Sequence, residues 1–297
     1  MNFKKRNFFL IEYLGRTLVT LCGLLMIGIT IAIIGFIVSK GIQSFTVNHI
    51  SLSEILFSKN WSPNGTNPTY GALIFIVGSI LVSVGAVIIA APIAIALAIF
   101  MNYISPKFGE KILIPALEIL VGIPSVVYGF LGVTILVPFI RNISGGVGFS
   151  LIAGVIVLSI MVLPTISSIA SDAVRAVPKT YIEASYGLGS TRWQAIKMAI
   201  IPAAKTNLLT AIVLGLARAF GEALAVQMVI GNTIKFPNGI FDPTATLTGI
   251  LTMDMANTLN GTAWNNALWT LSMILLLISF LFILIIRLIG RKGGKVS

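Results

Sequence analysis

The dominant pattern along the chain is a series of long apolar runs separated by shorter polar segments. A helix needs about 20 consecutive apolar residues to cross the hydrocarbon core of a bilayer. Six runs reach that length, and each predicts a transmembrane helix: 18–39, 72–100, 112–140, 150–171, 208–231 and 264–289. We therefore predict an all-α membrane protein with a single transmembrane domain over residues 1–297.

Proline residues fall inside or beside several of these runs. Pro92, Pro115, Pro124 and Pro164 each remove one backbone hydrogen bond from a helix. Because hydrocarbon offers no replacement partner, the freed carbonyls need a neighbouring helix or water. We expect bends at these positions that face protein or a cavity.

The first apolar run lies between Arg16 and Lys40 and carries no charge. It is longer than the apolar region of a signal peptide, and no clear small-residue cleavage site follows it. We expect this run to be a retained membrane helix.

Basic residues flank the runs unevenly, which predicts the orientation. Beside the spans, four basic residues fall on one side, namely Lys40, Lys59, Arg141 and Lys235, and Arg218 lies within a span. The remaining 15 of the 20 fall on the other side: Lys4, Lys5, Arg6, Arg16, Lys107, Lys111, Arg175, Lys179, Arg192, Lys197, Lys205, Arg287, Arg291, Lys292 and Lys295. Cytoplasmic segments carry the excess of Lys and Arg. Both termini are thus predicted to be cytoplasmic, with segment 41–70 external and loop 172–205 cytoplasmic.

Composition supports a membrane protein and argues against nucleic acid as a partner. Hydrophobic residues make up 57% of the chain and charged residues only 10%, against roughly 45–50% and about 25% in soluble domains. The net charge of +11 comes from clusters beside apolar runs that are not interleaved with aromatic residues. Anionic lipid head groups are the expected partners of these clusters.

The loop 172–205 contains a motif with recognisable spacing. The residues Glu183-Ala184-Ser185-Tyr186-Gly187-Leu188-Gly189 predict a helix that ends at a glycine turn. Ten residues later, Ala199-Ile200-Ile201-Pro202 predicts a second helix that stops near the proline. An ordinary cytoplasmic helix hairpin is the simplest interpretation of this pattern.

The same spacing resembles the EAA loop of ABC-importer permeases. Glu183, Ala184, Gly189 and Pro202 match that motif in register. Ser185, Ala199 and Ile201 depart from it. The resemblance implies that this loop docks in a groove of an ATPase subunit.

The fifth run carries two charges, Arg218 and Glu222. Residues four apart share one helical face, where opposite charges can pair. Each charge alone in lipid costs about 2.5–3.5 kcal/mol, so a pair or a polar cavity must offset that cost. The two side chains lie either at a translocation path or its gate, or in an ion pair that holds helices in register.

Glu118 is the third charge within a predicted span, and it lies just before a stretch from Gly122 to Gly129. Glu118 either accepts hydrogen bonds from a neighbouring helix or lies near the cytoplasmic edge with little role. The stretch contains Pro124, Ser125 and Tyr128 and predicts a break in the third helix. Broken helices in transporters often line the cavity.

Several motifs together resemble the C-type permease subunits (PstC) of phosphate ABC importers. They are Trp61-x-Pro63, Tyr70-Gly71, Gly122 to Gly129, Arg218-x-x-Gly221-Glu222-Ala223-x-Ala225-Val226 and Ile230-Gly231-Asn232. The sister A-type permease has Thr-Ala-Pro after the Gly-Glu pair, where this chain has Ala223-Leu224-Ala225. The resemblance implies the MetI-like permease architecture in the inner membrane. It also implies phosphate import together with an A-type permease, two ATP-binding subunits and an external phosphate-binding protein.

Catalytic and cofactor motifs are absent from the sequence. The one histidine, His49, lies in the external segment, so a His-based metal site and a Ser-His-Asp triad lack their parts. No phosphate-cradling glycine loop is present, so we expect no enzyme activity, no cofactor and an ATPase on another chain. A molybdate or sulfate permease, the A-type permease and a stand-alone secondary transporter remain alternatives, and a membrane-embedded enzyme is disfavoured.

Overall fold

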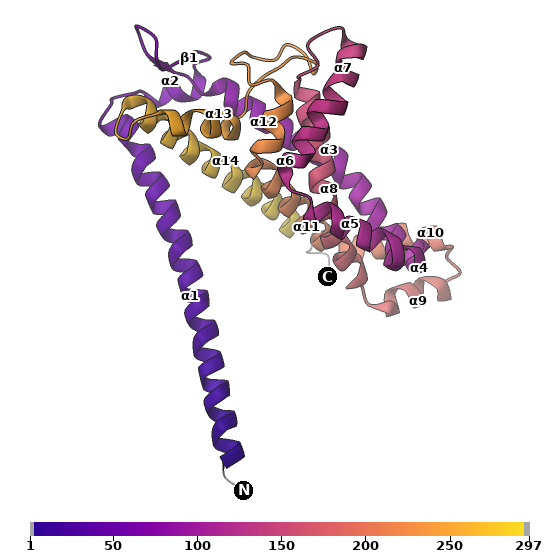
Figure 1. Cartoon of the computed structure of the whole chain (residues 1–297). Helices are drawn as coiled ribbons and strands as arrows, with labels where there is room; N and C mark the ends of the chain where they lie inside the picture. The colour runs from indigo at the N-terminus through magenta and orange to yellow at the C-terminus, as the bar shows by residue number, and fades with distance from the viewer. Residues whose placement is uncertain (1–2, 294–297) are drawn as a thin grey trace.

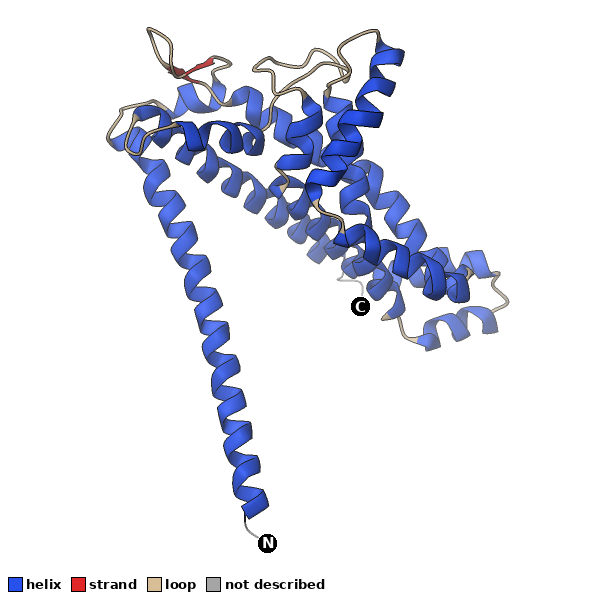
Figure 2. Cartoon of the chain, in the orientation of Figure 1, coloured by secondary structure: helices blue, strands red, loops and turns tan. Residues whose placement is uncertain are grey.

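The structure is a computed structural model that describes the backbone of residues 3–293 and the side chains of residues 13–288. Helices dominate it, and one short hairpin is the only β-structure drawn in Figure 2. Lys295 lies outside the described residues, as do the side chains of Lys4, Lys5, Arg6, Arg291 and Lys292.

Within the described residues, six helical segments are long and apolar enough to cross a membrane: Tyr13–Thr46, Leu73–Ile104, Ser125–Ser144, Leu151–Arg175, Arg192–Gly221 and Ala263–Leu288. Each corresponds to one predicted span, which confirms the all-α membrane fold. The individual helices are α1 (Phe3–Thr46), α2 (Leu52–Phe57), α3 (Leu73–Ile99), α4 (Pro106–Phe108), α5 (Ile114–Gly122), α6 (Ser125–Leu131), α7 (Val137–Ser144), α8 (Leu151–Arg175), α9 (Lys179–Gly187), α10 (Arg192–Ala195), α11 (Ile201–Gly221), α12 (Leu224–Ile230), α13 (Leu247–Asp254) and α14 (Ala263–Gly293).

Helix α1 is a long arm that leaves the rest of the molecule (Figure 1). Its residues from 13 to 36 are exposed. The C-terminal part of α1 packs on α14, where the rings of Phe36 and Trp269 meet edge to face with their centroids 5.2 Å apart. The Thr270 hydroxyl donates to the Gly41 carbonyl at 2.7 Å. Helix α1 continues to Thr46, so the first residues of the predicted external segment 41–70 are helical.

Helices α3, α8 and α11 form the central bundle, and small residues let them approach closely. Ala86, Ala90, Ala94 and Ala98 recur every fourth residue on α3 and are fully buried. On α11, a Cβ added at Gly215 would overlap the Ile166 side chain. Lipid tails are as apolar as leucine, so close van der Waals packing of this kind must hold membrane helices together.

A cap closes the end of the bundle opposite α9 and α10 (Figure 1). It consists of the segment 47–72, which contains α2 and the β-hairpin, and the segment 231–262, which contains α13. Strands β1 (Trp61–Ser62) and β2 (Thr69–Tyr70) pair antiparallel with Trp61 opposite Tyr70. The Trp61 ring packs edge-on against Phe75 at 5.4 Å, beside the buried side chain of Leu268. The cap is thus anchored to the first turn of α3 and the start of α14.

Wide π-helical turns precede four prolines. The turns are η1 (Phe100–Ile104), η2 (Gly109–Leu113), η3 (Gly132–Leu136) and η4 (Ile196–Ile200), and the prolines, each two residues further on, are Pro106, Pro115, Pro138 and Pro202. A proline ring clashes with the carbonyl four residues earlier in a regular helix. We attribute the wide turns to this clash, because a π-bulge changes the hydrogen-bond register just before the ring.

One sequence prediction about prolines needs correction. The second helix of the loop 172–205 does not stop near Pro202, because α10 runs through η4 into α11, whose first turn contains that proline. Pro92 and Pro164 lie inside the continuous helices α3 and α8. Pro124 does break the third span, between α5 and α6.

The close approach of the cap to α3 predicts the effect of a single added methyl group. Gly78 on α3 lies so near the Ala245 carbonyl oxygen that a Cβ would overlap it. Since that oxygen belongs to backbone, Gly78→Ala should lower the free energy of unfolding by about 1–3 kcal/mol. Thermal unfolding of the purified protein in detergent measures this as a lower midpoint.

Gly28→Ala is the matched control, since nothing lies within 4 Å of a Cβ at Gly28 on α1. An unchanged midpoint for Gly78→Ala would contradict the close packing of the cap against α3.

Candidate functional site

The fifth span is interrupted at Glu222. Helix α11 ends at Gly221, Glu222 has extended backbone angles (φ −74°, ψ 128°), and α12 begins at Leu224. The prediction that Arg218 and Glu222 share one helical face is therefore wrong. The helix is thus interrupted at a charged residue, Glu222, inside the predicted span 208–231.

The groups freed by this break are satisfied by protein. The Glu222 carboxylate accepts a hydrogen bond from the Ala225 backbone N–H at 3.2 Å, in the first turn of α12. Its backbone carbonyl accepts one from the Thr248 hydroxyl on α13 at 2.9 Å. Glu222 thus holds both the start of α12 and the position of α13.

A small polar space lies beside Glu222 inside the bundle. Its polar lining is Ser79 and Ser83 of α3, Glu222, and Thr246 and Thr248. The space measures about 10 Å³, roughly enough for one water molecule. The Ser79 hydroxyl also accepts a hydrogen bond from the Leu247 N–H at 2.8 Å.

Arg218 lies exposed in the last turn of α11. Its guanidinium donates to the hydroxyl of Thr165 on α8 at 2.9 Å. That contact leaves most of the five guanidinium N–H donors available to another acceptor.

Thr165 begins a polar stripe on α8. The stripe continues through Ser168, Asp172 and Arg175, at the i, i+3, i+7, i+10 spacing of one helical face, and these three are exposed. An exposed polar stripe on a membrane helix is costly against lipid and is expected to face protein or water. The helical spacing of these polar residues, which begins inside the apolar run 150–171, is the sequence signal that could have identified the stripe.

Three residues of the stripe, Ser168, Asp172 and Arg175, line a cavity of about 420 Å³ between α5 and α8. Glu118 of α5 lines the same cavity. Arg175 is held by a hydrogen bond from its Nε to the Asn102 side-chain oxygen at 3.3 Å. The structure therefore brings Glu118 together with one basic and one acidic side chain of α8.

The break in the third span is bridged by Tyr128. Ile123 and Pro124 are extended between α5 and α6, and the Tyr128 hydroxyl donates across the break to the Leu120 carbonyl at 2.8 Å. Tyr128 is only 9% exposed, so it supports the break, whereas Pro124 is exposed and Ser125 half-buried.

The half-helices after the two breaks pack on each other. A Cβ at Gly129 of α6 would lie 2.6 Å from the Met228 sulfur and 3.1 Å from the Ala225 Cα, both on α12. A Cβ at Gly132 would lie 2.6 Å from Val229. Gly129 of α6 and Gly132, which follows α6, thus allow α12 to pack closely. The two broken spans are therefore in direct contact.

The loop between α8 and α11 presents apolar side chains at the far end of the bundle. Gly189 has a left-handed φ of 80° and turns the chain after α9, and α10 begins with a capping box between Thr191 and Gln194. Leu188 is 90% exposed and Trp193 62% exposed. Such exposed apolar residues on a polar loop indicate a surface for another protein.

The matched motif residues occupy this loop and its exit. Glu183 and Ala184 lie exposed on α9, and Ala184, Gly189 and Ala199 help to line a groove of about 580 Å³ between α9 and the α10–η4 segment. Pro202 lies beyond the groove, in the first turn of α11.

Comparison with known proteins places the chain in a family. Residues 94–293 match the family described as "Binding-protein-dependent transport system inner membrane component". The chain is 54% identical over 289 residues to the probable ABC transporter permease protein YqgH of Bacillus subtilis, covering 97% of this chain and 94% of that protein. It is 34% identical over 266 residues to the phosphate transport system permease protein PstC of Pasteurella multocida, covering 82% of each.

Solved structures agree on the fold. The chain resembles a bacterial alginate ABC transporter with a TM-score of 0.67 at 15% identity, covering 97% of this chain and 99% of that one. It resembles the MetNI methionine ABC transporter with a TM-score of 0.56 at 19% identity, covering 74% and 92%. Together with the six apolar spans, these matches show that the chain is a multi-pass membrane protein that belongs to the family of inner membrane permease components of binding-protein-dependent transport systems.

Proposed function

We propose that the chain forms half of the translocation pathway of an ATP-driven importer of inorganic phosphate. The observation that carries this proposal is the exposed Arg218 guanidinium, whose one hydrogen bond within the described residues is to Thr165, beside the break at Glu222. A cation with free donors at that depth matches a tetrahedral oxyanion. The printed name of the Pasteurella relative, a phosphate transport permease, supports phosphate as that oxyanion.

The exposed polar stripe of α8 supports a pathway that this chain completes with a second permease. Thr165 and Ser168 lie within the predicted fourth span, and Asp172 and Arg175 continue the stripe toward the α9–α10 end, so the stripe is better suited to an aqueous path than to lipid. We propose an A-type permease as the second half, with an external phosphate-binding protein at the capped end. The excess of basic residues supports a cytoplasmic position for both termini and for the α9–α10 end.

The loop that carries α9 and α10 is proposed as the contact for two ATP-binding subunits, one on each permease. Helix α10 continues through η4 into α11, so a force on the loop acts on one helical rod. That rod ends at Gly221, one turn after Arg218 and directly before Glu222. Movement of the loop would therefore shift Arg218 against Thr165 and flex the break at Glu222, which gives alternating access.

Substitution at the two charges tests the pathway. Arg218→Gln should lower ATP-dependent phosphate uptake by about tenfold or more, because it removes a charge-assisted contact to the anion. Glu222→Gln should also lower uptake, although its amide oxygen can still accept from the Ala225 N–H. Labelled phosphate uptake into vesicles containing the assembled importer measures both effects.

Arg141→Gln and Glu110→Gln are matched controls, since both side chains are exposed away from the break. Assembly must equal that of the wild type in every variant. Wild-type uptake by Arg218→Gln would refute a role for Arg218 in the pathway. Equal competition by molybdate or sulfate would show that the importer serves another oxyanion.

Coupling is tested at the most exposed apolar residue of the loop. Leu188→Asp should abolish co-purification of the ATPase subunits and phosphate uptake, because a charge would be buried in an apolar contact. Leu259→Asp is the matched control for ATPase co-purification, since Leu259 is 78% exposed at the opposite, capped end. Retention of the ATPase by Leu188→Asp would refute docking through this loop, and transport without any ATPase would favour a secondary transporter.

A further inference from the structure

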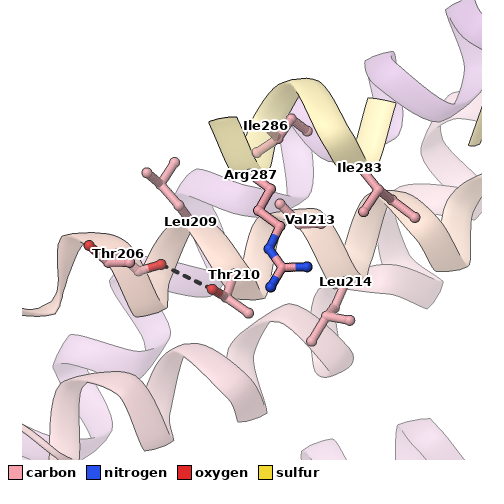
Figure 3. A pocket seen from close by; sticks show the side chains of 8 residues that line it. All are labelled: Thr206, Leu209, Thr210, Val213, Leu214, Ile283, Ile286 and Arg287. Atoms are coloured by element: carbon pink, nitrogen blue, oxygen red, sulfur yellow. Dashed lines mark hydrogen bonds between the residues drawn. The ribbon is translucent and has the colours of Figure 1, made fainter. Parts of the chain in front are cut away.

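A second groove lies between α11 and α14, on the part of α11 that precedes Arg218. It measures about 360 Å³ and is lined by Thr206, Leu209, Thr210, Val213 and Leu214 of α11 and by Ile283, Ile286 and Arg287 of α14. Figure 3 shows the Arg287 side chain reaching from α14 across the groove toward Thr210 and Leu214. The groove takes no part in the proposed pathway, because neither Arg218 nor the α8 stripe lines it.

The groove has two chemically different parts. Leu209, Val213, Ile283 and Ile286 are half-buried and form an apolar wall. Arg287, Thr206 and Thr210 are exposed and provide a cation and two hydroxyls. The Thr210 hydroxyl donates to the Thr206 carbonyl at 3.1 Å, so Arg287 and the Thr206 hydroxyl are the side-chain donors that the groove offers to an anion.

The charge of this groove is uncompensated. No carboxylate is among the side chains that line it in the described part of the chain. Lys205 precedes Thr206 and adds a second exposed cation nearby in the sequence. The groove therefore favours an anion.

The groove between α11 and α14 lies at the depth of the lipid head groups. Arg287 is the first charged residue after the uncharged apolar run of α14, and Arg291 and Lys292 follow it in the sequence. Thr206 lies near the first turn of α11, just after the loop that carries α9 and α10. The excess of basic residues assigns this end of the bundle to the cytoplasm, where the anionic lipids lie.

We propose that this groove binds one anionic phospholipid of the cytoplasmic leaflet. The guanidinium of Arg287 donates to the phosphodiester oxygens, and the apolar wall packs against the upper acyl chain. Leu281, Leu284 and Leu288 are exposed on α14 and extend the apolar surface beyond the groove. A free phosphate ion fits less well, because the apolar wall would desolvate oxygens that it cannot hydrogen-bond.

Native mass spectrometry of the full chain, alone and in the assembled importer, tests this proposal. The probes are phosphatidylglycerol and phosphatidylcholine with identical acyl chains. The wild type should prefer phosphatidylglycerol, and Arg287→Gln should weaken its binding by about tenfold. Arg287→Lys should retain most of the preference because the positive charge remains.

Arg141→Gln is the matched control, since it removes an exposed arginine elsewhere in the chain and should leave lipid binding unchanged. Millimolar inorganic phosphate should not displace the lipid. Equal binding of both lipids, displacement by phosphate, or unchanged binding by Arg287→Gln would each overturn the proposal. Loss of the bound lipid on assembly would also overturn it, because the groove would then be a contact between subunits.

Discussion

Inside a bilayer, a backbone amide or carbonyl that leaves a helix finds no water and must bond to protein. Two of the six spans leave their helices within the apolar segments, and the surrounding structure supplies the missing partners. Thr248 and the Glu222 carboxylate serve the fifth span, and Tyr128 bridges the third. Because α6 packs directly on α12, the two breaks form one supported unit.

The proposed coupling depends on the continuity of the helix that follows the loop. The segment from α10 through η4 to α11 is unbroken, and the helix is interrupted where Glu222 begins the next segment. Arg218 lies in the last turn of α11 and donates a hydrogen bond to Thr165 of α8. Under the proposed function, movement of the loop would shift Arg218 relative to the polar stripe of α8.

Local properties of the sequence predicted much of this fold. Apolar run length located all six spans, Pro124 predicted the third-span break, and glycine predicted the turn after α9. The fifth-span break was missed because Thr248, which stabilises it, is 26 residues away. The contact of Arg218 with Thr165 crosses 53 residues. Both depend on helix packing, which local periodicity does not encode.

The central claim is that the polar face of α8 lines a path whose access changes with ATP. Ser168→Cys, combined with Cys22→Ser to remove the one cysteine of the sequence, allows a direct measurement. A membrane-impermeant thiol reagent applied to the assembled importer should label the introduced thiol from the α9–α10 side without nucleotide, and far more slowly when ATP is trapped. Equal labelling rates in both states would contradict the account.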